Sequence, residues 1–142
     1  MSAPHRYVHR VQIDEVDAAG IVFFARYFGW CHEAMATMLE SLEGGYAGLL
    51  NRHGIGLPTV HVDADYFAPL RFGDAAAVSV VVETIGTSSC TIGFRVDRQA
   101  DATRVASIRH VVVLVDVREM RPVPFPVELR AVLESRRCAE AR

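Results

Sequence analysis

The chain has 142 residues, of which 51% are apolar and 23% are charged, and its formal net charge is −2 at pH 7. This length predicts one domain with a sizeable hydrophobic core, and the composition excludes a disordered or fibrous protein. The slightly negative charge argues against a nucleic-acid-binding protein, because such proteins carry a strongly basic face.

The cysteines, and the absence of a signal peptide or a long apolar run, indicate the cellular location of the protein. Cys31, Cys90 and Cys138 are widely spaced and odd in number, which is typical of reduced cytosolic thiols. The first residues contain no apolar stretch of the kind found in signal peptides. No apolar run reaches the roughly 18–20 residues that a membrane span needs. We therefore expect a cytoplasmic protein that makes no contact with membranes.

The N-terminal part of the chain predicts a strand followed by a long helix. Residues 7–13 alternate loosely between apolar and polar side chains, as in a short strand. After a turn rich in small residues, apolar side chains recur every three or four positions over residues 28–42, which predicts an amphipathic helix of about four turns. The pair Gly44-Gly45 is expected to end this helix, and a shorter helix is expected over residues 46–52.

From residue 56 onward the pattern is that of a sheet. Four β segments are expected, over residues 57–70, 75–84, 90–97 and 105–117. The third has the cleanest alternation, and residues 111–115 are apolar on both faces, which is typical of a central strand. A short amphipathic helix is expected over residues 127–137.

The predicted fold is therefore α+β: one antiparallel five-stranded sheet wrapped around one long central helix, in a single domain of residues 1–142. Such a sheet, covered on one face only, leaves its other face or an edge exposed. Because the strands are strongly apolar, we expect the chain to form an oligomer.

Two motifs and two longer segments carry a resemblance to a known family. The motifs are Asp-Ala-Ala-Gly-Ile-Val at residues 17–22 and Trp-Cys-His-Glu-Ala at residues 30–34, and Tyr27 follows Gly20 by seven positions. Residues 62–74 and 121–126 are similar to the family's second strand and C-terminal signature. The chain resembles the hot-dog fold acyl-CoA thioesterases, in particular the Asp-type branch of the 4-hydroxybenzoyl-CoA thioesterase family, close to 1,4-dihydroxy-2-naphthoyl-CoA thioesterases.

This resemblance implies an activity and an assembly. The expected reaction is hydrolysis of an aromatic or compact acyl-CoA, such as 4-hydroxybenzoyl-CoA or 1,4-dihydroxy-2-naphthoyl-CoA, to the free acid and CoA. CoA is then part of the substrate, and no cofactor and no metal are expected. Active sites are expected at the subunit interface of a homodimer or homotetramer. A broader acyl-CoA or acyl-carrier-protein thioesterase and a non-catalytic acyl-CoA-binding module are the alternatives.

The resemblance also implies two catalytic groups. In the family, the carboxylate at the position of Asp17 is catalytic, and the backbone N–H at the position of Phe24 binds the oxyanion. A carboxylate close to a helix N-terminus suits this chemistry, because N–H donors there stabilise developing negative charge. A thioester has a good leaving group, so an ionised carboxylate serves either as nucleophile or as general base, and both roles stay open. Outside this motif, an Asp beside Gly is ordinarily a turn or helix-capping residue.

Two positions depart from the family's common pattern. The first carboxylate of the motif is usually Asp and is Glu15 in this chain, where it is not expected to be a second catalytic carboxylate. Phe24 replaces a common Tyr, and this change should matter little because the expected donor is the backbone N–H.

Further residues are predicted to contact the substrate. They are Gly20, Ile21, Tyr27, His32 and His61. Gly20 and Ile21 belong to the catalytic motif, and Tyr27 packs near it. His32 lies off the centre of the apolar helix stripe, where it lines either the acyl pocket or a subunit interface.

His61 lies in the segment that the resemblance places at the dimer seam. It shares one strand face with Asp63 and Asp65. Three successive positions on one face span about 13 Å, which is too far for one metal ion, so this face is expected to line the substrate channel instead.

Overall fold

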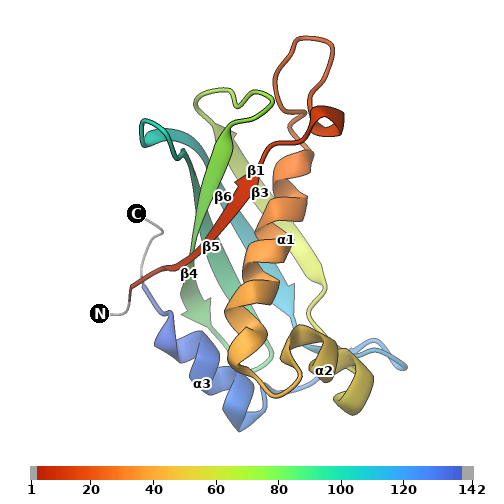
Figure 1. Cartoon of the computed structure of the whole chain (residues 1–142). Helices are drawn as coiled ribbons and strands as arrows, with labels where there is room; N and C mark the ends of the chain where they lie inside the picture. Colours follow the sequence, from red (N-terminus) through yellow and green to blue (C-terminus); the bar gives the residue numbers. More distant parts are fainter. Residues whose placement is uncertain (1–2, 139–142) are drawn as a thin grey trace.

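A computed structural model describes residues 3–138 of the chain. A five-stranded antiparallel sheet with strand order β1-β4-β5-β6-β3 lies against the long helix α1 (Figure 1). Its elements are β1 (His5–Arg10), α1 (Arg26–Met38), β3 (Thr59–Tyr66), β4 (Ala75–Ile85), β5 (Ser89–Arg98) and β6 (Thr103–Val113). The predicted arrangement of one helix on a five-stranded sheet is confirmed.

Shorter elements complete the fold. They are η1 (Ile13–Glu15), η2 (Leu39–Ser41), α2 (Gly45–His53), β2 (Ile55–Gly56), β7 (Val115–Asp116), β8 (Arg121–Pro122) and α3 (Val127–Ser135). Strands β2, β7 and β8 form a small second sheet that the sequence did not predict, because strands of two residues show no alternation. Helices α2 and α3 lie at the end of α1 that is distant from its N-terminus (Figure 1).

Helix α1 follows from the spacing of its apolar residues. The side chains that it buries lie three or four positions apart and form one stripe. They are Tyr27, Trp30, Cys31, Ala34, Met35 and Met38. The helix ends at Met38, earlier than predicted, and the chain continues through η2. Gly44, with φ of +77°, precedes α2 as its N-cap and does not terminate α1.

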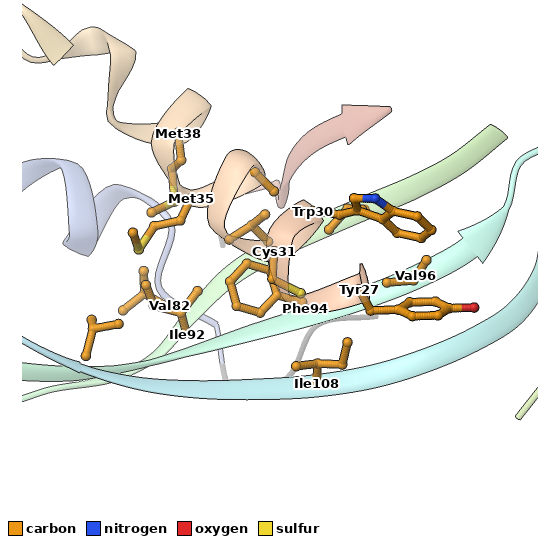
Figure 2. Close-up of a cluster of buried hydrophobic side chains, with 14 of the residues drawn as sticks. Tyr27, Trp30, Cys31, Met35, Met38, Val82, Ile92, Phe94, Val96 and Ile108 are labelled. Carbon is orange, nitrogen blue, oxygen red and sulfur yellow. The ribbon is translucent and has the colours of Figure 1, made fainter. Parts of the chain in front are cut away.

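The core lies between α1 and the sheet. Val80, Phe94 and Ile108 are opposite one another across β4, β5 and β6, and none of them is more than 1% exposed. Figure 2 shows side chains of α1, including Cys31 and Met35, packed over this part of the sheet. The alternation predicted for β5 is confirmed, since Phe94 and its same-face neighbours are all buried.

The strands β6 and β3 hold different positions in the sheet. β5 is the central strand of the sheet, whereas β6, which the apolar run at residues 111–115 predicted to be central, lies between β5 and the edge strand β3. Val60 and Val62 on this edge strand are 62% and 38% exposed in the single chain. In the part of the chain that the structure describes, no helix is both long and apolar enough to cross a membrane.

Candidate active site

The Asp-Ala-Ala-Gly-Ile-Val motif forms a tight loop before α1. Val16 and Val22 pair as an isolated antiparallel bridge. Inside this bridge, the Asp17 N–H donates to the Ile21 carbonyl and the Gly20 N–H donates to the Asp17 carbonyl, each at 2.9 Å. Gly20 has a φ of +79°, which favours glycine because it has no Cβ. The loop of residues 16–22, which includes Asp17, lies beyond the N-terminal end of α1 (Figure 1).

The Asp17 side chain is exposed and uses one oxygen within the loop. Its Oδ1 accepts a hydrogen bond from the Ala19 N–H at 2.8 Å, which is the geometry of an Asx turn. Among residues 3–138, no hydrogen-bond partner is found for Oδ2. The ordinary turn role and a chemical role are thus compatible, because one oxygen orients the carboxylate and the other faces solvent.

Phe24 lies in the turn between this loop and α1, two residues before the helix begins at Arg26. Its N–H has no acceptor within the described part of the chain. The neighbouring groups are held on both sides, since the Phe23 N–H donates to the Glu15 carbonyl at 2.9 Å and the Tyr66 hydroxyl donates to the Phe24 carbonyl at 2.8 Å. A free, oriented N–H next to a helix N-terminus can bind an oxyanion.

A cleft of about 610 Å³ opens beside Phe24. Its walls come from the motif loop, the start of α1 and the segment that follows β3. They are formed by Ile21, Val22, Phe24, Tyr27, Tyr66, Phe67, Ala68, Pro69 and Arg71. Three predicted site residues, Ile21, Phe24 and Tyr27, therefore share one cleft. Tyr66 and Phe67 were missed as individual residues, because only the fold brings the end of β3 against the turn before α1.

Tyr27 forms the buried side of the cleft. Its ring lies between those of Trp30 and Tyr66, with centroids 4.7 and 5.1 Å away. Burial, assisted by Tyr66, raises the pKa of Tyr27 to about 12, so its phenol stays neutral. This residue supports the cleft wall and supplies no charge.

Glu15 carries the most tightly bound carboxylate near the loop. Its Oε1 lies 2.7 Å from His9 Nε2 and accepts a hydrogen bond from the Gln12 backbone N–H at 2.8 Å. Its Oε2 accepts a hydrogen bond from Trp30 Nε1 at 2.7 Å. The residue is only 8% exposed. Both oxygens of Glu15 are thus bonded within the protein, whereas Oδ2 of Asp17 has no hydrogen-bond partner among residues 3–138.

The predicted histidines lie elsewhere on the single chain. His32 is exposed on α1, with its ring 5.8 Å from that of Tyr46. His61 is exposed on β3, and its Nε2 lies 3.8 Å from Asp63 Oδ2. Neither of these histidines lines the cleft beside Phe24. Within one chain, the structure does not bring them together with Asp17.

A third histidine, His110 on β6, was not singled out from the sequence. It is 5% exposed, between the rings of Phe28 and Phe94, and its Nε2 has no hydrogen-bond partner in residues 3–138. Burial, with a smaller effect of His32, lowers the pKa of His110 to about 4. The ring is therefore neutral at physiological pH.

The fold is one long helix on a five-stranded antiparallel sheet, with the Phe24 N–H at a cleft and the exposed Asp17 in the adjoining loop but not among the residues that line this cleft. Residues 11–133 match the model of the thioesterase-like superfamily. The chain belongs to this superfamily, and it is a thioester hydrolase.

Individual relatives support this assignment. A 1,4-dihydroxy-2-naphthoyl-CoA hydrolase of Synechococcus sp. (strain CC9605) is 31% identical over 133 residues, which cover 89% of each chain. The crystal structure of a 1,4-dihydroxy-2-naphthoyl-CoA thioesterase from Synechocystis has a TM-score of 0.82 at 24% identity and covers 91% of this chain and 94% of that one. A gentisyl-coenzyme A thioesterase has a TM-score of 0.79 at 26% identity, with 91% and 98% covered. The predicted hot-dog fold is confirmed.

Proposed function

We propose that this thioester hydrolase acts on compact aromatic acyl-CoA substrates, with 1,4-dihydroxy-2-naphthoyl-CoA and 4-hydroxybenzoyl-CoA as the first candidates. The observation that carries the proposal is the unpaired Phe24 N–H at an aromatic cleft beside the Asp17 loop. The relatives support the substrate class, because the naphthoyl and gentisyl groups in their names are both hydroxylated aromatic acyl groups.

The two groups have complementary tasks in the reaction. The Phe24 N–H donates to the thioester oxygen, which becomes an oxyanion when a nucleophile adds to the carbonyl carbon. Asp17 either attacks that carbon, so that CoA leaves as the thiolate and water then hydrolyses the acyl-Asp17 anhydride, or takes a proton from the water that attacks directly. Both routes consume one water and release the free acid and CoA, and they need no cofactor.

The walls of the cleft suit a flat acyl group. Tyr27, Tyr66 and Phe24 present aromatic surface to it, and aromatic rings pack well in offset or edge-to-face geometry. Arg71 lies at the same cleft and forms no ion pair within residues 3–138. A guanidinium binds phosphate oxygens with two parallel hydrogen bonds, so Arg71 is our candidate for contact with the CoA phosphates.

We further infer that the working unit is a homodimer or homotetramer with active sites at the subunit interface. The edge strand β3 exposes Val60 and Val62, and its outer side pairs with no other strand among residues 3–138. Such an edge is suited to cover by a second copy of the chain. Light scattering coupled to size exclusion would test this, and a monomer that hydrolyses acyl-CoA at full rate would contradict it.

The test of the function is a substrate panel with a matched pair of variants. The panel contains benzoyl-, 4-hydroxybenzoyl-, 1,4-dihydroxy-2-naphthoyl- and long-chain fatty acyl-CoA, and one acyl-carrier-protein thioester. We expect the highest kcat/KM on a hydroxylated aromatic acyl-CoA, and loss of turnover in Asp17→Asn but not in Asp14→Asn, an exposed neighbour. Binding without turnover by the wild type would indicate an acyl-CoA-binding module, and a preference for fatty acyl or carrier-protein thioesters would indicate a broader thioesterase.

A further inference from the structure

The carboxylate of Glu15 joins three separate parts of the fold. His9 lies on β1, Gln12 precedes η1, and Trp30 lies on α1. Every contact from these residues to the carboxylate is 2.7 or 2.8 Å long, and both oxygens are used. We call Glu15, His9, Gln12 and Trp30 the Glu15 clamp.

The clamp is built for an ionised carboxylate. Burying such a group costs free energy unless hydrogen bonds compensate it, and bonds to a charged acceptor are stronger than neutral ones. Burial opposes ionisation of Glu15, but its hydrogen bonds, of which that from His9 is the strongest, outweigh burial and hold the pKa of this carboxyl below its ordinary value. The rings of His9 and Trp30 stack with centroids 4.7 Å apart, which fixes the two side-chain donors.

The backbone of Glu15 connects the clamp to the reacting groups. Its carbonyl accepts the hydrogen bond from the Phe23 N–H, one residue before the proposed oxyanion donor at Phe24. Asp17 follows Glu15 by two residues, at the start of the loop that the Val16–Val22 bridge closes. Displacement of the Glu15 backbone would therefore move the Asp17 carboxylate and the Phe24 N–H together.

We propose that Glu15 is a positioning residue for thioester hydrolysis, which holds Asp17 and the Phe24 N–H in register through the Glu15 clamp without touching the substrate. This rests on the proposed function. An oxyanion donor acts through its placement, and a displacement of about 1 Å in an active site can cost about 10²-fold in rate. The role differs from catalysis by a second carboxylate, because both oxygens of Glu15 are already bonded within the protein.

The kinetic test uses Glu15→Gln and Glu15→Asp. We expect kcat of Glu15→Gln on the best aromatic acyl-CoA to fall about 10²-fold, with KM within about twofold of the wild type, because the clamp does not contact the substrate. Glu15→Asp keeps a carboxylate and should recover part of the loss. Glu83→Gln is the matched control, since Glu83 is also a little-exposed carboxylate, paired with Arg109 at 2.7 Å on the other face of the sheet.

The NMR and fluorescence signals of Trp30 report on the Glu15 clamp without a measurement of turnover. Trp30 is the only tryptophan of the chain, so a single indole N–H resonance and one fluorescence signal report on its bond to Glu15. We expect the indole proton to move upfield in Glu15→Gln, to stay closer to the wild-type position in Glu15→Asp, and not to move in Glu83→Gln. If Glu15→Gln does not fold, Trp30→Phe replaces it, because this variant removes one donor of the clamp and keeps the carboxylate and the ring packing.

The outcomes separate this inference from the proposed function. If the wild type hydrolyses no thioester of the panel, the proposed function fails. If the wild type is active and a variant that has lost the Glu15–Trp30 bond keeps the wild-type kcat, the positioning role alone is wrong. A rise in KM at unchanged kcat would also overturn it, because Glu15 would then be a substrate-binding residue.

Discussion

The hydroxyl of Tyr66 donates a hydrogen bond to the carbonyl oxygen of Phe24, with 2.8 Å between the two oxygen atoms. The two residues are 42 positions apart in the chain. The bond ties the end of the edge strand β3 to the turn that presents the proposed oxyanion donor. A displacement of the end of β3 would therefore move the Phe24 carbonyl with it.

Removal of this hydroxyl should lower the rate with little effect on the fold. We expect Tyr66→Phe to reduce kcat about tenfold, because the Phe24 carbonyl, next to the proposed donor, loses its hydrogen bond to Tyr66, and to cost about 1 kcal/mol of stability. Tyr46→Phe is the matched control, since its hydroxyl also bonds a backbone group, the Leu57 N–H, away from the cleft. Equal kcat in wild type and Tyr66→Phe would show that the bond has no part in catalysis.

Arg71 should distinguish substrates by their phosphates. We expect Arg71→Ala to raise KM for an aromatic acyl-CoA about tenfold and to leave KM for the corresponding acyl-pantetheine, which lacks the nucleotide phosphates, unchanged. Arg118→Ala, an exposed arginine outside the cleft, should change neither value. An equal rise for both thioesters would place Arg71 against the acyl or pantetheine part instead.

His110 should make the stability depend on pH. Because its pKa in the folded chain is about 4, below the value of 6.5 for an ordinary histidine, the unfolded chain binds the proton more readily. The contribution of this neutral ring is fully present above pH 6.5 and is lost as the pH falls toward 4; it amounts to on the order of 3 kcal/mol. His110→Leu should flatten this part of the pH profile in urea unfolding, while His53→Leu, at an exposed site, should not. The same pH dependence in His110→Leu and wild type would refute the assignment.

The side chain of Glu83 on β4 should disfavour any residue larger than glycine at position 93. A Cβ at this position would overlap the Oε2 atom of Glu83, which lies across β5 to reach Arg109. We expect Gly93→Ala to cost about 1–3 kcal/mol in denaturant unfolding, and the double variant with Glu83→Ala to recover most of this loss. Additive costs of the two substitutions would contradict the overlap.

Periodic segments explain how much of the fold could be predicted. The alternation of β5 and the stripe of α1 depend on local spacing, so the sheet and the helix followed from sequence alone. The end of α1 did not, because the apolar spacing continues to Leu42 although the chain leaves the helix after Met38. Strands β2, β7 and β8 are too short to carry a pattern.

The candidate site was predictable only where a motif marks it. Asp17 and Phe24 were named through their resemblance to a family, and the structure places Phe24 at the cleft. The bonds of Glu15 to Trp30 and of Tyr66 to Phe24 join residues 15 and 42 positions apart, so no local pattern reveals them. The sequence predicts that Glu15 is not a second catalytic carboxylate, and in the structure both of its oxygens are bonded to other residues of the chain.

The most direct measurement is the single-turnover rate of Asp17→Asn beside that of Asp14→Asn and the wild type, with 1,4-dihydroxy-2-naphthoyl-CoA and 4-hydroxybenzoyl-CoA. We expect a loss of about 10³-fold or more in Asp17→Asn, with acyl-CoA still bound, and a wild-type rate in Asp14→Asn. An Asp17→Asn variant that hydrolyses both thioesters at the wild-type rate would show that Asp17 is not the nucleophile or general base.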